Sequence, residues 1–211
     1  MTTEWIVGIA GASGSGKSSL AANLVSRLAG QLDGPEVVVL SEDAYYRSRT
    51  DLTFQQRSEV NYDHPDVFEH SLLLQHLREL RAGKPVDVPQ YDYATHLRKT
   101  EVMRVVPPRL LVVEGILIFH DPALRSEFNL SLFVDVPLET CLERRLVRDT
   151  GERGRTRESV LEQFEATVRP MYFEFVEPTR KWADMIVPGG GQNQTALDVL
   201  SAFFETRFAD R

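Results

Sequence analysis

A glycine-rich stretch near the start of the chain has the residues needed to bind phosphate. The stretch "GASGSGKSS" comprises Gly11, Ala12, Ser13, Gly14, Ser15, Gly16, Lys17, Ser18 and Ser19. It matches the pattern G-x-x-x-x-G-K-[ST], in which glycines let backbone N–H groups turn toward phosphate oxygens. Lys17 would reach the β- and γ-phosphates of a nucleoside triphosphate, and the Ser18 hydroxyl would bind Mg²⁺. An apolar run precedes the stretch and a helical pattern follows it, as this motif requires.

Three acidic residues fall at the expected ends of buried strands. Asp43 lies in "LSEDAYY", Glu114 in "LLVVEG" and Asp135 in "LFVDVP". Ligands of an open α/β sheet collect at the carboxyl ends of its strands. Asp43 could accept the proton of an attacking hydroxyl, or it could be a loop carboxylate or a helix cap. Glu114 could hold Mg²⁺ directly or through water, whereas Asp135 favours a structural role at a helix N-terminus.

An arginine-rich stretch, "LERRLVRDTGERGRTRES", comes after these strands. Arg145 and Arg148 are three residues apart and share a helix face, and Gly151 and Gly154 then loosen the chain. The pattern indicates a mobile lid over about residues 149–158, whose arginines would stabilise charge on a transferred phosphoryl group. The alternative is a solvated helix face with ion pairs, and Arg145 and Asp149 have the i,i+4 spacing for one.

The stretch "YDYATHLR" gathers three rings that could contact one small ligand. Tyr91 and Tyr93 share a face of a straight strand, whereas His96 has the opposite parity. All three can therefore meet one ligand only if the chain turns, and Ala94 and Thr95 are the predicted turn. A neutral histidine offers one donor and one acceptor, so it could serve a carbonyl or an amino group. The alternative is a hairpin histidine that points to solvent.

The elements that must position these residues follow from apolar patterning. Five continuous, mostly β-branched runs predict strands that are covered on both faces, at residues 5–10, 37–41, 110–114, 132–136 and 185–188. Helical periodicity separates them, so the predicted fold class is α/β, with a five-stranded parallel sheet flanked by helices. Residues 86–106 break the pattern and predict an inserted β-hairpin at about 85–106. With the arginine-rich lid, these elements form one expected domain over residues 1–211.

Composition and missing motifs exclude several classes of function. The net charge of −7 argues against a protein that coats nucleic acid, since phosphate neutralisation needs a basic surface. Cys141 is the only cysteine, so no intrachain disulfide or thiolate metal cluster can form. There is no signal-peptide pattern, and no apolar run approaches the ~18 residues that span a bilayer. A cytoplasmic protein without a membrane partner is therefore expected. The GTPase strings D-x-x-G and N-K-x-D do not occur, which leaves a small-molecule phosphotransferase.

Seven blocks together resemble the uridine kinase (uridine-cytidine kinase) family, from near the start to about residue 195. They are, in order, "GASGSGKS", "SEDAYY", "NYDHPDVFEH", "PQYDYATHLR", "VVEGILIF", "RRLVRDTGERGR" and "FVEPTRKWADMIVP". The combination is more specific than the phosphate-binding loop alone. The resemblance implies transfer of phosphate from ATP to the 5′-hydroxyl of uridine or cytidine, with Mg²⁺ at Ser18 and Glu114. It also implies a tetramer and feedback inhibition by CTP or UTP.

The resemblance assigns roles to individual residues. Asp43 would be the general base, while Lys17, Arg148 and Arg153 would act on the phosphates. The nucleoside side would comprise Tyr46, Tyr62, Asp63, Tyr91, Tyr93, His96, Arg145, Arg155 and Gln163. For Asp63 the implied partner is the ribose, and a carboxylate suits a cis-diol because it can accept two hydrogen bonds. The alternative for Asp63 is a turn residue before a proline.

The chain departs from the family pattern at one loop, and alternatives to the leading function stay open. Gly189 stands where many relatives have arginine, and Gln192 lies in the same loop, so ATP or GTP could be the donor. A kinase with a phosphoribulokinase- or pantothenate kinase-like acceptor is one alternative, although the DHPD and YD-x-x-x-H blocks are not expected there together. A nucleotide-binding regulator that has lost catalysis is another, against which Asp43, Glu114 and the lid arginines argue.

Overall fold

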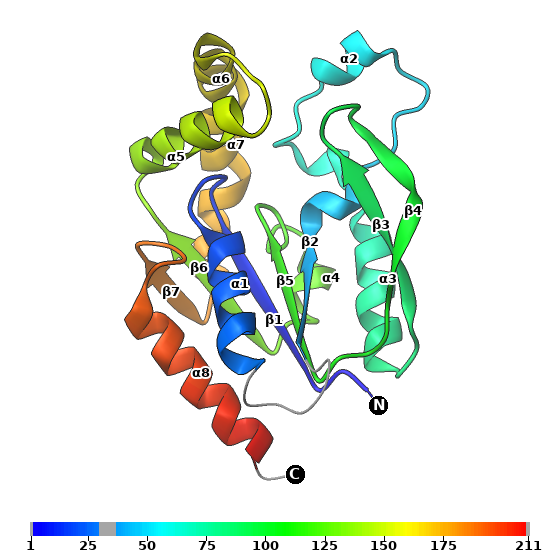
Figure 1. Ribbon diagram of the computed structural model, residues 1–211, viewed down its shortest axis with the longest axis vertical. Coiled ribbons are helices and arrows are strands. Elements are labelled where there is room, and N and C mark those ends of the chain that lie inside the picture. The colour runs from blue at the N-terminus through cyan, green and yellow to red at the C-terminus, as the bar shows by residue number, and fades with distance from the viewer. Residues whose placement is uncertain (1, 30–36, 210–211) are drawn as a thin grey trace.

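Five parallel strands form the central sheet of the protein (Figure 1). The computed structural model describes residues 2–29 and 37–209. In the spatial order β2-β5-β1-β6-β7, the strands are β2 (Val37–Ser41), β5 (Leu110–Gly115), β1 (Trp5–Gly11), β6 (Leu130–Asp135) and β7 (Met185–Pro188). The predicted five-stranded parallel sheet is confirmed, and each predicted strand overlaps an observed one. Because β1 is central, the glycine-rich stretch leaves the sheet at its middle.

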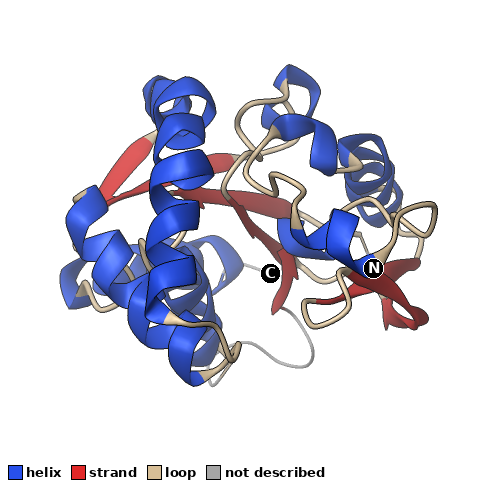
Figure 2. Ribbon diagram, turned by 90° about the horizontal axis from the view of Figure 1, so that it is seen from above, coloured by secondary structure: helices blue, strands red, loops and turns tan. Residues whose placement is uncertain are grey.

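Helices cover both faces of this sheet (Figure 2). They are α1 (Lys17–Leu28), α2 (Phe54–Ser58), α3 (His70–Arg81), α4 (Pro122–Arg125), α5 (Leu138–Gly151), α6 (Arg157–Gln163), α7 (Arg169–Met171) and α8 (Gln194–Ala209). Short 3₁₀ turns add η1 (Glu42–Tyr45), η2 (Pro65–Val67) and η5 (Glu177–Trp182). Two π-helical turns, η3 (Phe164–Val168) and η4 (Tyr172–Val176), flank α7. In the described part of the chain, no helix has both the length and the apolar character to span a membrane.

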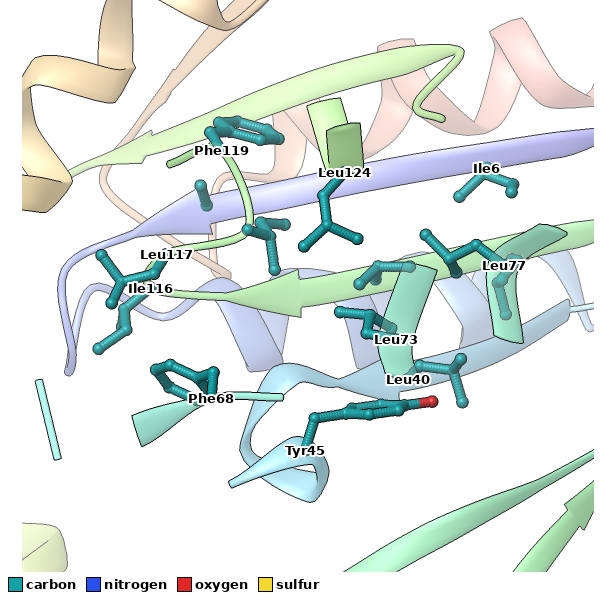
Figure 3. Packing of buried hydrophobic residues seen from close by; sticks show 14 of the residues in the cluster. Ile6, Leu40, Tyr45, Phe68, Leu73, Leu77, Ile116, Leu117, Phe119 and Leu124 are labelled. Atoms are coloured by element: carbon teal, nitrogen blue, oxygen red, sulfur yellow. The ribbon is translucent and has the colours of Figure 1, made fainter. Parts of the chain in front are cut away.

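Successive side chains of the strands pack into two separate hydrophobic clusters, one on each face of the sheet. Leu111 and Val113 of β5 belong to the cluster that includes α3, whereas Leu110 and Val112 belong to the cluster that includes α1 and α8. This alternation follows from the two-residue period of a strand, which sends successive side chains to opposite faces. Figure 3 shows the first cluster, where leucines of α3 such as Leu73 lie against the sheet. Apolar burial on both faces explains why the strands read as continuous apolar runs.

An antiparallel hairpin stands beside the sheet, between α3 and β5 in sequence. Its strands are β3 (Val86–Asp92) and β4 (Leu97–Val105), with a register shift between Pro89 and Tyr91. Residues 93–96 form the turn that the parity of the three rings predicts. Asp92 holds the turn, because its carboxylate accepts hydrogen bonds from Ala94 N and Thr95 Oγ1, each 2.9 Å long. The hairpin tip and α2 stand together at the end of the molecule where the central strands finish (Figure 1).

Asp135, at the end of β6, has its hydrogen-bond partner far away in the sequence. Asp135 does not cap α5, which starts after Pro137 without a side-chain capping hydrogen bond. Its carboxylate instead accepts a hydrogen bond of 2.8 Å from Arg180 of η5. This contact joins two segments that lie 45 positions apart in the chain, so local spacing could not reveal it.

Candidate active site

The glycine-rich stretch forms a loop that leads from the end of β1 into α1. Gly14 and Gly16 have positive φ angles of 87° and 95°, a backbone conformation that favours glycine. Space also requires glycine there, since an added Cβ would lie 2.5 Å from the Cys141 carbonyl oxygen at Gly14 and 2.9 Å from Gly191 N at Gly16. The loop therefore has the conformation and the helix N-terminus that suit a bound phosphate.

Lys17 and Ser18 at the start of α1 meet Glu114 at the end of β5. Ser18 Oγ donates a hydrogen bond of 3.1 Å to Glu114 Oε2, and Lys17 Nζ lies 4.0 Å from the same oxygen. Parallel pairing of β1 with β5, which sets Ile9 opposite Glu114, brings these residues together. Burial raises the pKa of the Glu114 carboxyl, although the Lys17 charge opposes that effect.

The Ser18 and Glu114 oxygens could hold a hard cation. Mg²⁺ prefers oxygen ligands and is usually bound through one or two carboxylates together with waters and substrate phosphates. Within residues 2–29 and 37–209, no group of three or more His, Cys, Asp or Glu side chains could hold a metal ion without such help. The donor set therefore fits an ion that arrives with a nucleotide.

Asp43 lies in η1, directly after β2. Because Ser41 of β2 pairs with Glu114 of β5, the strand ends bring Asp43 close to Glu114. The Asp43 charge contributes to the raised pKa of Glu114. The hydroxyl of Tyr93 donates a hydrogen bond of 2.7 Å to Asp43 Oδ2, although these residues are 50 positions apart.

A buried pair that sequence reasoning missed anchors η1. Glu42 is fully buried, and its Oε1 lies 2.7 Å from His70 Nε2 at the start of α3. Its Oε2 accepts a hydrogen bond of 3.0 Å from Leu117 N. Gly115 leaves the space for this carboxylate, since an added Cβ would lie 2.2 Å from Glu42 Oε2. Glu42 thus ties the turn that carries Asp43 to two other elements.

Four of the residues predicted to bind the nucleoside form an aromatic group between η1, the hairpin and the loop after α2. The Tyr46 ring lies 4.9 Å from that of Tyr91 and 5.2 Å from that of Tyr62. The Tyr62 ring in turn stacks on His96, at 5.1 Å and an interplanar angle of 18°. His96 has a φ of 55°, in the left-handed region that the turn requires. It therefore faces the aromatic group and does not point freely to solvent.

Asp63 is a buried carboxylate without a hydrogen-bond partner. Its residue is only 8% exposed, and no described group donates a hydrogen bond to its carboxylate oxygens. Burial raises the pKa of Asp63, while the nearby Arg145 and Lys17 charges oppose this and the Asp43 charge adds to it. Asp63 thus lies between the aromatic group and the phosphate-binding loop, with two free acceptor oxygens.

The arginine-rich stretch converges on one acidic residue, Asp149, which has no exposed surface. Distances from Asp149 carboxylate oxygens to guanidinium nitrogens are 3.7 Å for Arg145, 2.8 Å for Arg148, 3.7 Å for Arg153 and 3.9 Å for Arg155. Burial alone would raise the pKa of Asp149, but the hydrogen bond from Arg148 and the arginine charges outweigh it and lower that pKa. The solvated-face alternative is therefore wrong for Arg145, which is only 6% exposed.

Arg145 and Gln163 connect this arginine cluster to the rest of the site. Arg145 Nη1 donates to Ser13 Oγ in the phosphate-binding loop at 2.6 Å, and its Nη2 donates to Gln163 Oε1 at 3.2 Å. Arg155 also donates to Gln163 Oε1. The predicted lid segment comprises the end of α5, which continues through Gly151, then a short loop and the start of α6. Gln163 thus contacts two other residues predicted to bind the nucleoside, Arg145 and Arg155.

Arg144 and the loop after β7 brace the phosphate-binding loop, a role not predicted from the sequence. Arg144 Nη1 donates to the Ser15 carbonyl at 2.9 Å, and its Nη2 donates to the Gly189 carbonyl at 3.4 Å. Gly190 approaches so closely that an added Cβ would lie 2.3 Å from the Ser15 carbonyl oxygen. Around Gly189 no atom lies within 4 Å of such a Cβ, although its φ of 77° favours glycine.

A hollow of about 660 Å³ on the surface does not coincide with these residues. Its lining includes Arg47, Asp66, His70, His120 and Asp121, none of which is a predicted site residue. It adjoins the site through His70, the partner of Glu42, and through Phe68, whose ring stacks on that of Tyr46 at 4.5 Å. The convergence of Lys17, Asp43, Asp63, Glu114 and the arginine cluster therefore defines the candidate active site.

Comparisons with known proteins identify the family to which the chain belongs. The model of the phosphoribulokinase/uridine kinase family matches residues 6–196. A protein named uridine kinase from Proteus mirabilis is 51% identical over 197 residues, which cover 93% of this chain and 92% of that protein. A protein of the same name from Yersinia enterocolitica is 48% identical over 204 residues, which cover 95% of this chain and 96% of that protein. The solved structure of a possible uridine kinase from Bacillus stearothermophilus shares the fold, with a TM-score of 0.59 and 21% sequence identity. The match covers 89% of this chain and 90% of that one. The chain therefore belongs to the phosphoribulokinase/uridine kinase family.

Proposed function

We propose that this protein transfers the γ-phosphoryl group of ATP to the 5′-hydroxyl of uridine and of cytidine, giving UMP and CMP. The observation that carries the proposal is Asp63, a buried carboxylate with two free acceptor oxygens beside stacked tyrosine and histidine rings. A ribose cis-diol is the acceptor group that such a carboxylate matches, and flat rings match a nucleobase. Relatives about half identical in sequence are named uridine kinase, which supports the same acceptor.

The site residues divide the reaction between them. The loop from Gly11 to Ser19 would bind the triphosphate, and Lys17 would neutralise its β- and γ-oxygens. Asp43 would accept the proton of the 5′-hydroxyl while that oxygen forms a bond to the γ-phosphorus and the bond to ADP breaks. Arg148 and Arg153, which lie beside Asp149, would turn toward the charge on the transferred group, and Arg145 of the same cluster contacts Ser13 of the phosphate-binding loop. Bound Mg²⁺, held by Ser18 and Glu114 with the nucleotide, would supply further positive charge.

His96 supports a site that accepts both pyrimidines. Its ring is placed by the stack on Tyr62, and neutral imidazole can donate to a carbonyl or accept from an amino group. Burial lowers the pKa of His96, and the Arg57 and Arg155 charges act in the same direction. Neutral imidazole is therefore the form favoured at physiological pH, as this role requires.

Several finer features are part of the proposal by family membership. They are a homotetramer, feedback inhibition by CTP and UTP, a role in pyrimidine salvage and a location in the cytoplasm. The choice between ATP and GTP rests on the loop that holds Gly189 and Gln192, where the family arginine is missing. The proposal treats the chain as one catalytic domain, with an inserted hairpin and a mobile lid.

A rate comparison among acceptors tests the proposed function. ADP release should be fast with uridine and with cytidine, and mass spectrometry should detect UMP and CMP. Ribulose 5-phosphate and pantothenate should give only background rates. Turnover of either of those acceptors in place of the nucleosides would assign a different kinase of the same family. Nucleotide binding without turnover of any acceptor would indicate a regulator.

Replacement of Asp63 by asparagine tests the ribose contact. The change keeps the shape but removes the charge that strengthens two accepted hydrogen bonds, each worth about 1.5–3 kcal/mol to a charged group. We expect the nucleoside Kd, measured by calorimetry, to rise by at least about tenfold, while the ATP Kd stays within about twofold. Asp87→Asn is the matched control, because it removes an exposed hairpin carboxylate that forms an ion pair with Arg104. An unchanged nucleoside Kd in Asp63→Asn would contradict the ribose assignment.

A further inference from the structure

Tyr93 connects three parts of the candidate site from the tip of the hairpin. Its hydroxyl donates a hydrogen bond of 2.7 Å to Asp43 Oδ2 in η1. The guanidinium group of Arg153 lies over the face of the Tyr93 ring, 4.4 Å from the ring centroid. Its ring also meets that of Tyr91 edge-on at 5.5 Å. One side chain thus contacts the proposed base, the lid and the nucleoside side.

The Asp43 carboxylate depends on this contact for its orientation. In the described part of the chain, the Tyr93 hydroxyl is the only group that donates a hydrogen bond to either Asp43 carboxylate oxygen. The backbone of η1 is fixed separately by Glu42, which contacts His70 and Leu117 N. Without Tyr93, the carboxylate could rotate about its side-chain bonds although its backbone stayed in place.

We infer that Tyr93 is a positioning residue, whose hydroxyl holds Asp43 Oδ2 so that Oδ1 faces the acceptor hydroxyl and takes its proton. The inference rests on the proposed function, because it requires Asp43 to be the general base. A base must lie within hydrogen-bond reach of the proton that it removes, and small misplacements cost large factors in rate. Ring contact with the nucleoside, the role expected for Tyr93, needs no hydroxyl.

The surroundings keep the Tyr93 hydroxyl a donor. Tyr93 is 42% exposed, but partial desolvation of its hydroxyl raises the pKa of Tyr93, and the charge of Asp43 and the hydrogen bond to it raise that pKa further. The phenol therefore stays protonated over the pH range in which such enzymes are assayed.

Tyr93→Phe separates the hydroxyl from the ring, because phenylalanine keeps the surface under Arg153 and beside Tyr91. We expect kcat for uridine to fall by about tenfold with a change in KM below about threefold. We also expect the acidic limb of the pH profile of kcat/KM to move to higher pH, since the carboxylate loses a donor. In an Asp43→Asn background, Tyr93→Phe should cost nothing further, because the residue that it positions no longer acts.

Tyr45→Phe is the matched control. Tyr45 lies in the same 3₁₀ turn, and its buried hydroxyl bonds to His76 Nδ1 at 3.0 Å, away from the Asp43 carboxylate. Its loss should lower Tm without moving the acidic limb of the profile. A limb that moves equally in both variants would overturn the inference, because loosening of η1 would then explain the effect.

Two further results would each overturn the inference, and they are distinguishable. If Asp43→Asn abolishes turnover but Tyr93→Phe leaves kcat and the pH profile unchanged, Asp43 remains the proposed base and its positioning by Tyr93 is refuted. If Tyr93→Phe raises kcat or lowers KM, the hydrogen bond obstructs Asp43 instead of orienting it. Full activity of Asp43→Asn would be a failure of the proposed base itself.

Discussion

Asp43→Asn is expected to lower kcat by about 10³- to 10⁴-fold, while the Kd for uridine changes by less than about threefold. Asparagine has the shape of aspartate but cannot accept the proton of the 5′-hydroxyl. The structure gives no other described carboxylate the same position, because Glu114 is engaged with Ser18 and Lys17. Asp43 is also tied to the site by Tyr93, whereas the Asp63 carboxylate has no such bond.

Steady-state ADP release measures kcat for this variant, and calorimetry measures nucleoside binding. Asp87→Asn serves as the control, since it removes one negative charge from an exposed position and should leave kcat unchanged. Equal loss of nucleoside binding and kcat in Asp43→Asn would indicate a binding role. Near-normal turnover would remove Asp43 as the base.

Asp149→Asn is expected to destabilise the fold by about 3 kcal/mol at neutral pH, because it removes one partner of a buried charge cluster. Asp149 is fully buried, and Arg145 beside it is only 6% exposed. Without the carboxylate, Arg145 would remain buried with its charge poorly compensated, and burial already lowers the pKa of Arg145. Arg148 and Arg153 would also lose the carboxylate beside which both of them lie. We therefore expect kcat to fall as well.

The loss of stability should depend on pH in a definite direction. The folded state lowers the pKa of Asp149, so the carboxylate stabilises the fold fully above its unfolded pKa of about 3.9. That contribution is lost as the pH falls through the lower pKa of the folded state. The difference in unfolding free energy between wild type and Asp149→Asn should thus be constant above about pH 5 and shrink in stronger acid.

Urea unfolding of both proteins from pH 3 to 7 measures this difference. Glu165→Gln is the matched control, because it breaks an exposed i,i+4 pair with Arg169 and should cost less than about 0.5 kcal/mol. A cost as small as that for Asp149→Asn would show that the arginine cluster does not depend on its central carboxylate.

Most of the sheet and the phosphate-binding loop could be predicted because their signals are local. A buried strand shows itself as an apolar run, and the loop is contiguous from Gly11 to Ser19. The bend in "YDYATHLR" could also be predicted, because side-chain parity along a strand is a local property. His96, with its φ of 55°, lies in the turn that this parity requires.

The contacts that organise the site could not be predicted in the same way. Asp43 and Tyr93 are 50 positions apart, Glu42 and His70 are 28 apart, and Arg144 reaches Ser15 across 129 positions. The same limit applies to Asp135, for which the nearby helix indicated a role at its N-terminus but could not reveal the hydrogen bond from Arg180. Within the arginine-rich stretch, the spacing of Arg145 and Asp149 suggested one ion pair, but not the convergence of four arginines.

The sequence by itself thus determined the strands, the loop that can bind phosphate and the residue types available for chemistry. Only the tertiary structure decided which of those residues meet, because strand order, register and helix packing set the distances between segments far apart in the chain. Pairing of β5 with both β1 and β2 brings Glu114 to Ser18 and close to Asp43. Folding of the hairpin toward η1 brings the Tyr93 hydroxyl to the carboxylate of Asp43.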